Sequence, residues 1–208
     1  MSDTTPNGGP EAAPRLAPLA PDDLDPYMRS IYGAVGRGGA ANMVATMGHH
    51  PHLSERFLPV TIALQAGELP GRQREMVILR VAVWRRCRYV WEQHARLALR
   101  AGLGVDALGA LATGATSAVW EDADRIVLAA VDQLLADSTM DDATWEALAT
   151  VYGPSQLVEL CILVGHYSGL CFLANAADVA LDEGGDPVPA LPDPVGGLPS
   201  ASAPEGNQ

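Results

Sequence analysis

The longest apolar segment of the chain runs over residues 154–181 and has the length and low polarity of a buried helix. Such a helix is stable in water only when other elements cover it on several sides. We therefore predict that it is the central helix of the domain. Its most apolar part, residues 157–181, is interrupted by Glu159, His166, Asn175 and Asp178, which argues against a membrane span.

The preceding segments also show the 3.6-residue period of helices, and none shows β-branched alternation or a hairpin dipeptide. Glycine, proline and acidic residues stand where these helices would begin or end. The predicted helices cover residues 24–35, 40–47, 51–66, 70–85, 89–101, 105–112, 121–136 and 141–152. The sequence therefore predicts an all-α fold made of a single helical domain.

Both ends of the chain are rich in Pro, Gly, Ser and Ala and have no period that could bury a face. We predict a disordered N-terminal tail over residues 1–14, a helical domain over 15–183, and a disordered C-terminal tail over 184–208. The N-terminal residues contain no apolar stretch typical of a secretory signal. The three cysteines are too few for a disulfide scaffold, so we expect a reducing, cytoplasmic location.

The charge balance excludes several classes of function. The formal net charge of -12 disfavours binding to nucleic acid or to an anionic membrane surface, because both are negatively charged. All the cationic side chains are arginines, and the chain has no lysine. Schiff-base chemistry, pyridoxal phosphate anchoring and the phosphate-binding P-loop all require a lysine amine, so we exclude them.

Proton-exchanging groups are concentrated around the junction of two predicted helices. Glu75 lies on the first helix, and the second carries Cys87, Tyr89 and His94 within two turns. Cys87 is expected near a helix N-terminus, where free N–H groups and the helix dipole favour a thiolate. His94 lies roughly 10 Å further along the axis, so a direct hydrogen bond to Cys87 is not expected. Val90, four residues before His94, should lie against the imidazole.

This pattern is similar to that of a known family. The order is Arg-Glu at 74–75, then Cys-x-Tyr-x-x-x-x-His at 87–94, with an upstream His-Pro and a Gly-x-Tyr in the last helix. It resembles the carboxymuconolactone decarboxylase and alkyl hydroperoxidase D-like superfamily over roughly residues 40–182. The resemblance implies an all-helical fold, a homo-oligomer and no organic cofactor.

In the peroxidase branch of that superfamily, a glutamate and a histidine relay protons to a Cys-x-x-Cys pair. The resemblance assigns Glu75, Cys87 and His94 to three of these roles. Val90 stands where the second cysteine of the pair belongs. A peroxidase needs a second thiol to resolve the sulfenic acid, and here only Cys161 or Cys171 could supply it.

We therefore expect a small-molecule enzyme that uses acid–base chemistry, such as a decarboxylase, a lactone-opening enzyme or an isomerase. Its substrate would be a small organic acid, a lactone or a polycyclic metabolite. His94 would act as general base or acid, Glu75 would orient it, and Cys87 and Tyr89 would be polar contacts or a second acid. Two alternatives stay open: a thiol peroxidase that uses Cys87, and a non-catalytic interaction protein.

The residues expected to line the pocket are Val90, Trp91, Trp84, His166 and Tyr167. Trp84 and Trp91 could instead be ordinary core residues, as could His94 and Cys87. His166 and Tyr167 could instead pack at a subunit interface. Glu75 could simply pair with Arg72 or Arg74. The His-His-Pro-His motif at 49–52 is interpreted as a helix boundary, so no metal site is predicted. The arginine-only, Ala- and Gly-rich composition is typical of a high-GC bacterium.

Overall fold

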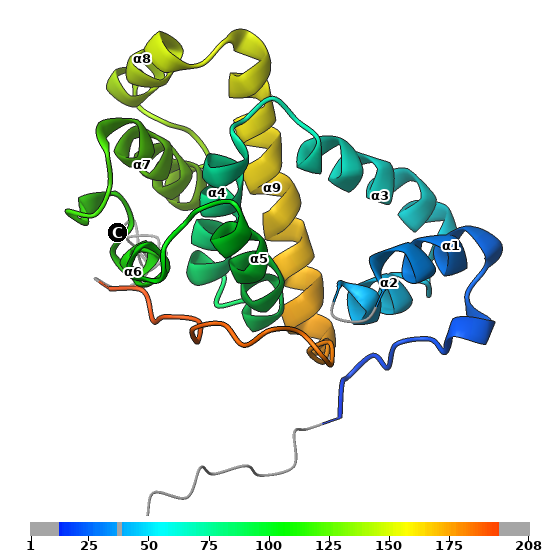
Figure 1. Ribbon diagram of the computed structural model, residues 1–208. Coiled ribbons are helices and arrows are strands. Elements are labelled where there is room, and N and C mark those ends of the chain that lie inside the picture. Colours follow the sequence, from blue (N-terminus) through cyan, green and yellow to red (C-terminus); the bar gives the residue numbers. More distant parts are fainter. Residues whose placement is uncertain (1–12, 37–38, 196–208) are drawn as a thin grey trace, which may run out of the picture.

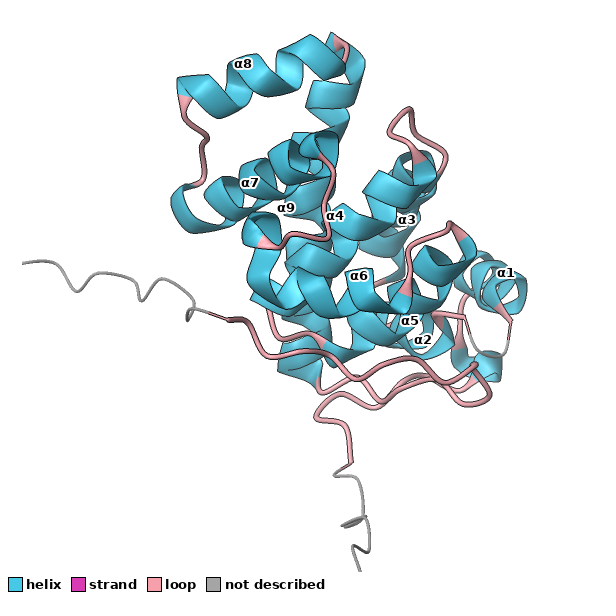
Figure 2. Cartoon of the chain, turned by 60° about the vertical axis from the view of Figure 1, so that its left-hand side comes forward, coloured by secondary structure: helices cyan, strands magenta, loops and turns pink. Residues whose placement is uncertain are grey.

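The computed structural model describes residues 13–36 and 39–195, and these residues form an all-α domain (Figures 1 and 2). Two 3₁₀ helices, η1 and η2, accompany the α-helices. The elements are η1 (Pro21–Asp23), α1 (Pro26–Val35), α2 (Ala41–Met47), α3 (Pro51–Gln65), α4 (Gly71–Trp84), α5 (Arg88–Arg100), α6 (Val105–Ala110), η2 (Leu111–Thr116), α7 (Asp122–Asp137), α8 (Asp142–Val151) and α9 (Pro154–Ala177). The predicted fold class is confirmed.

The helices begin where the sequence has capping residues. The Asp25 side chain accepts hydrogen bonds from two backbone N–H groups at the start of α1, and Asp141 accepts one at the start of α8. His50 caps α3 in the same way, with Pro51 as the first helical residue. The His-His-Pro-His motif is therefore a helix start. Within the described residues, no three His, Cys, Asp or Glu side chains form a cluster that could hold a metal ion.

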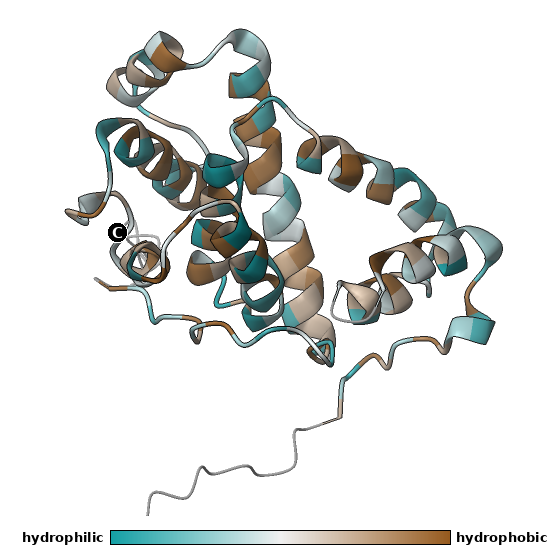
Figure 3. Ribbon diagram, in the orientation of Figure 1, coloured by the Kyte–Doolittle hydropathy of each residue, from teal (hydrophilic) through white to brown (hydrophobic). Residues whose placement is uncertain are grey.

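Two helices form the centre of the domain. Residues 75–83 of α4 are all buried, and α4 packs against α5, α7 and α9. By length and hydropathy α9 would pass as a membrane span, but half of its most apolar stretch is buried inside this domain. Figure 3 shows that α4, α7 and α9 all carry many apolar residues. The prediction of a central last helix agrees with this packing.

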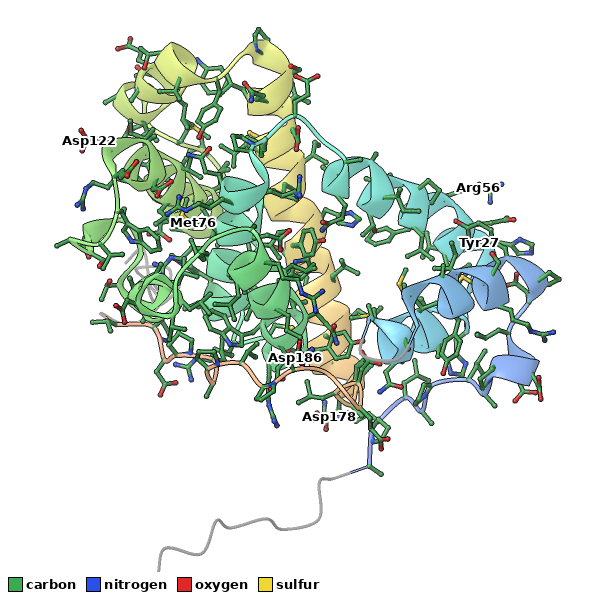
Figure 4. The ribbon with its side chains drawn as sticks, viewed as in Figure 1. Tyr27, Arg56, Met76, Asp122, Asp178 and Asp186 are labelled. Atoms are coloured by element: carbon green, nitrogen blue, oxygen red, sulfur yellow. The ribbon has the colours of Figure 1, made fainter. Side chains whose placement is uncertain are left out.

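The last helix is shorter than the apolar run suggested. It was expected to continue to about Leu181, but it ends at Ala177, because Asp178 adopts a left-handed conformation with φ of 57°. Aspartate tolerates this conformation better than most residues. The chain then leaves the helix axis and crosses the surface below α5 and α6, where Figure 4 labels Asp178 and Asp186.

Part of the segment expected to be a disordered tail has defined contacts. Trp91 Nε1 donates a hydrogen bond of 2.8 Å to the Pro189 carbonyl, and the backbone N–H of Val195 donates one of 3.0 Å to the Ala112 carbonyl. Residues 184–195 therefore pack along the helical core. The remainder of the two predicted tails, residues 1–12 and 196–208, lies outside the described residues.

Asp182 anchors the beginning of this C-terminal segment. One carboxylate oxygen accepts hydrogen bonds from Tyr89 Oη at 2.5 Å and from Gln93 Nε2 at 2.8 Å. The other accepts from the backbone N–H of Asn42 at 2.7 Å. A single carboxylate thus links α5, α2 and the C-terminal segment, which are far apart in the sequence.

We predict that Asp182→Ala lowers the free energy of unfolding by about 1–3 kcal/mol, because the Tyr89 and Gln93 donors lose their acceptor. Urea denaturation followed by circular dichroism measures this change. Asp186→Ala is the matched control, since the Asp186 side chain is exposed and makes only a 3.7 Å ion pair with Arg100. Equal stability of the two variants would contradict the anchoring role.

Candidate functional site

The central polar contact joins consecutive helices. Glu75 lies on the buried part of α4 and is 3% exposed. His94 lies on the second turn of α5. His94 Nδ1 and Glu75 Oε2 are 2.7 Å apart. A tight turn brings the two helices together: Arg86 has a φ of 50°, and Cys87 N–H donates to the Ala82 carbonyl.

The second oxygen of Glu75 faces a cation. Arg74 Nε lies 3.6 Å from Glu75 Oε1, and both side chains are largely buried. The neighbouring Arg72 points elsewhere and forms a 2.7 Å ion pair with Asp124. Glu75 therefore has both of the partners that the sequence left as alternatives, the histidine and an arginine. A carboxylate with two such partners remains an acceptor that can orient the imidazole.

His94 lies on the wall of a pocket of about 100 Å³, which we call the inner pocket. Helices α2, α3, α5 and α9 contribute its walls. The lining residues are Ala40, Met43, Val44, Met47, Leu58, Thr61, Tyr89, Val90, Gln93, His94, Tyr167 and Leu170. Most of these side chains are apolar. Because Glu75 occupies Nδ1, Nε2 is the ring nitrogen of His94 that can serve a bound molecule.

A second, wider space lies on the other side of His94. This outer groove has a volume of about 500 Å³ and shares five lining residues with the inner pocket: Ala40, Thr61, Gln93, His94 and Tyr167. Arg96 and Arg100 also line it. The imidazole and the Tyr167 ring therefore stand between a small apolar pocket and a groove with cationic side chains.

The aromatic ring of Tyr167 contacts the imidazole ring of His94. The ring centroids are 4.9 Å apart with an interplanar angle of 89°, an edge-to-face arrangement. Its hydroxyl accepts a hydrogen bond of 2.5 Å from Gln65 Nε2. Burial raises the pKa of Tyr167 far above its usual value. The phenol therefore stays protonated at neutral pH and can donate a hydrogen bond.

Tyr89, expected as a second acid, has its hydroxyl engaged elsewhere. The ring lines the inner pocket, but the hydroxyl donates to Asp182 and accepts from the Met43 N–H at 3.1 Å. Burial also raises the pKa of Tyr89. Its phenol is thus a structural link between the pocket wall and the C-terminal segment.

Val90 is part of the wall of the inner pocket, whereas Cys87 is not. Val90 lines the inner pocket together with His94, as its i, i+4 spacing predicted. Cys87 is fully buried at the start of α5 and is not among the lining residues. The thiol that influences its pKa most is that of Cys171 on α9. The structure therefore separates Cys87 from the Glu75–His94 pair.

The other three expected lining residues lie outside the inner pocket. Trp84 Nε1 donates to Asp132 at 2.7 Å, and Trp91 is a core residue that binds the C-terminal segment. His166 stacks on Phe57 with ring centroids 4.4 Å apart, and its Nε2 lies 2.8 Å from Thr61 Oγ1. Side chains of α2 and α3 line the pocket instead. In the sequence these residues show only the apolar periodicity of any amphipathic helix, so nothing distinguished them as pocket residues.

Comparison with known proteins agrees with this arrangement. Residues 51–133 match the carboxymuconolactone decarboxylase family. The matched segment covers less than half of the chain. It contains Glu75, Cys87 and His94, so the resemblance noted from the sequence is confirmed. No curated protein sequence matches the chain significantly.

Solved structures share the fold at low sequence identity. The alkylhydroperoxidase AhpD core of a peroxidase-related protein from Ralstonia eutropha is 16% identical with a TM-score of 0.72, covering 83% of this chain and 94% of that one. A peroxidase-related protein from Silicibacter is 14% identical with a TM-score of 0.66, covering 84% and 96%. The debrominase Bmp8 in complex with 2,3,4-tribromopyrrole is 20% identical with a TM-score of 0.64, covering 81% and 91%.

We predict that Val90→Cys places a peroxide-reactive thiol beside His94. Cysteine nearly fills the volume of valine, and the Glu75–His94 pair can accept the thiol proton. In a Cys87→Ala background, which lacks the neighbouring thiol that could resolve a sulfenic acid at position 90, dimedone should label the substituted position after hydrogen peroxide treatment, and peptide mass spectrometry detects the label. Val131→Cys, in the fully buried part of α7, is the control and should stay unlabelled. Equal labelling of both variants would show that His94 does not activate a group at this position.

Proposed function

We propose that this protein is an enzyme that transfers protons on a small, mainly apolar organic molecule, in a decarboxylation, a lactone opening or an isomerisation. The observation that carries the proposal is the Glu75–His94 hydrogen bond on the wall of the inner pocket. A carboxylate that accepts from Nδ1–H leaves Nε2 unprotonated, which is the form required of a general base.

The proposed roles follow from the positions of the three polar groups. His94 Nε2 removes a proton from the substrate and later returns it, while Glu75 holds the ring and stabilises the imidazolium that forms. Tyr167, protonated and in edge contact with His94, donates a hydrogen bond to the oxygen on which negative charge develops. Because the chain has no lysine, the electron pair must be taken up by a carbonyl group of the substrate.

The two spaces limit the substrate. A cavity of about 150 Å³ holds one benzene ring, so an inner pocket of about 100 Å³ admits only a few heavy atoms. A larger ligand must extend into the outer groove, where Arg96 and Arg100 would favour an anionic end. We therefore propose an amphipathic substrate whose apolar end reaches into the inner pocket past His94.

Two observations support an enzyme over a non-catalytic interaction protein. His94 and Tyr167 both line one pocket, and the mainly apolar side chains around them leave that pocket open. The debrominase Bmp8 has the same fold and is described with a small aromatic ring bound, so the fold can accommodate small-molecule chemistry. The thiol peroxidase alternative depends on Cys87, which does not line this pocket.

Hydrogen–deuterium exchange tests the proton transfer without knowledge of the natural substrate. A panel of small keto acids and γ-lactones is incubated in D₂O with the protein, and NMR follows exchange beside the carbonyl. We expect catalysed exchange for at least one probe, and a fall of about 10²–10⁴-fold in His94→Ala. Tyr167→Phe should lower the rate for the same probe without removing it.

The control for this experiment is His52→Ala, because His52 is an exposed histidine at the start of α3. It should exchange the probe at the wild-type rate. Undiminished exchange in His94→Ala would refute the assignment of the base, and no exchange with any probe above the protein-free rate would refute the reaction class.

A homo-oligomer and a cytoplasmic location stay predictions. The surface that supports self-association is an apolar groove between α3 and α9, lined by Val60, Val158 and Ile162 among others. These three side chains are all exposed in the single chain. Exposed apolar side chains that gather on one face are typical of an interface.

We predict that the wild-type protein is larger than a monomer in light scattering at micromolar concentration, and that Ile162→Glu reduces its mass to that of one chain. Leu97→Glu introduces the same charge at another exposed apolar residue and should leave the mass unchanged. A monomeric wild type would refute this interface.

A further inference from the structure

Two of the three free cysteines meet at a helix junction that the acid–base proposal does not use. Cys87 is the residue that precedes the first turn of α5, and Cys171 lies in the second half of α9. Both are 0% exposed, and both are free thiols. The two thiols lie close enough to influence each other's pKa, since α5 and α9 pack together.

Contacts on both sides of the pair hold it in place. Asn175 Nδ2, one turn after Cys171, donates a hydrogen bond of 2.8 Å to the Arg85 carbonyl, two residues before Cys87. The Arg85 guanidinium in turn lies 5.0 Å from the centroid of the Phe172 ring. The turn before α5 and the end of α9 are therefore fixed against each other, with the two sulfur atoms between them.

We propose that Cys87 and Cys171 are a reversible redox pair, which a hydroperoxide oxidises to a disulfide between α5 and α9. This pair would supply across two helices the second thiol that Val90 removes from the Cys-x-x-Cys position. The inference does not rest on the proton-transfer function, because neither cysteine lines the inner pocket.

The surroundings give the two thiols different roles. The neighbouring Cys171 thiol lowers the pKa of Cys87, and the backbone N–H groups of Val90 and Tyr89 at the start of α5 add to this effect. The same thiol contact raises the pKa of Cys171. Because Cys87 also stands at the N-terminus of α5, where the helix dipole favours a thiolate, we assign it as the nucleophile and Cys171 as the resolving thiol.

The chemistry is balanced with a hydroperoxide as the oxidant. The Cys87 thiolate attacks the terminal oxygen of ROOH, the O–O bond breaks, and the alkoxide takes a proton and leaves as ROH. Cys87 is then a sulfenic acid. Cys171 attacks its sulfur, the S–OH bond breaks, and water leaves as the disulfide forms. An external dithiol returns both residues to thiols by exchange.

A solvent-accessible hollow reaches this corner of the molecule. Its volume is about 370 Å³, and its lining includes Arg86 and Arg88 on either side of Cys87, together with Ala174, one turn from Cys171. The hollow therefore brings solvent to the neighbours of both cysteines, while the two sulfur atoms themselves stay buried. The reaction that we propose requires a local opening at this corner.

Cys161 is an internal control. It lies ten residues before Cys171 on the same helix, roughly 15 Å away along the axis, and is partly buried. Burial raises the pKa of Cys161, so its thiol is the less reactive form. A structural account in which all three cysteines are simply core residues would give no selectivity for one pair.

The experiment treats the full-length protein with one equivalent of hydrogen peroxide and then alkylates the free thiols under denaturing conditions. We expect the intact mass to fall by about 2 Da before alkylation, for the two hydrogens lost, and only one thiol to be alkylated. Peptide mapping without reductant should give a peptide that links Cys87 to Cys171. Dithiothreitol should restore all three thiols.

Variants assign the order of the two steps. Cys161→Ala should form the disulfide as the wild type does, whereas Cys171→Ala should stop at a sulfenic acid on Cys87 that dimedone traps. Cys87→Ala should form neither. His94→Ala should keep the disulfide reaction, so that a failure of the proton-transfer proposal is distinguishable from a failure of this one.

Three results would overturn the proposal: three alkylated thiols in peroxide-treated wild type, a disulfide that includes Cys161, or dimedone labelling on Cys171 in place of Cys87. The first two are read from the wild-type protein alone. The proposal therefore remains testable even when removal of a buried cysteine prevents a variant from folding.

Discussion

The hydrogen bond between Glu75 and His94 constrains the site more than any other contact. A carboxylate buried in the middle of a helix is costly unless charged or hydrogen-bonding groups satisfy it. His94 and Arg74 do so here. The bond sets α5 against α4 in one register, and it holds the imidazole on the pocket wall. The same interaction thus joins two consecutive helices and fixes the orientation of the imidazole.

The contrast between His94 and Cys87 shows how one helix can serve two sites. Both residues belong to the beginning of α5, but His94 lies against the inner pocket, and Cys87 faces the interior between α5 and α9. Val90 lies between them in the sequence and gives the pocket an apolar wall. Proton transfer and thiol oxidation would therefore occur in separate surroundings.

The solved structures with this fold are described as peroxidase-related proteins and as a debrominase. A fold shared at 14–20% identity does not determine the reaction, because the chemistry depends on a few side chains at the site. In this chain those side chains include the apolar Val90 beside the histidine. The C-terminal segment adds a further local feature, since Asp182 binds Tyr89 and Gln93 on the pocket wall.

The sequence by itself determined the helices, because capping residues and the 3.6-residue period are local signals that each segment carries alone. The sequence also identified Glu75 and His94, because both residues belong to a family pattern contained in one short segment of the chain. Only the tertiary structure decided that Tyr167 faces His94, that Cys171 meets Cys87, and that Asp182 holds Tyr89. These partners are separated by more than seventy residues, and no local pattern specifies such contacts. They form when α9 packs into the domain and the chain after it returns across α5.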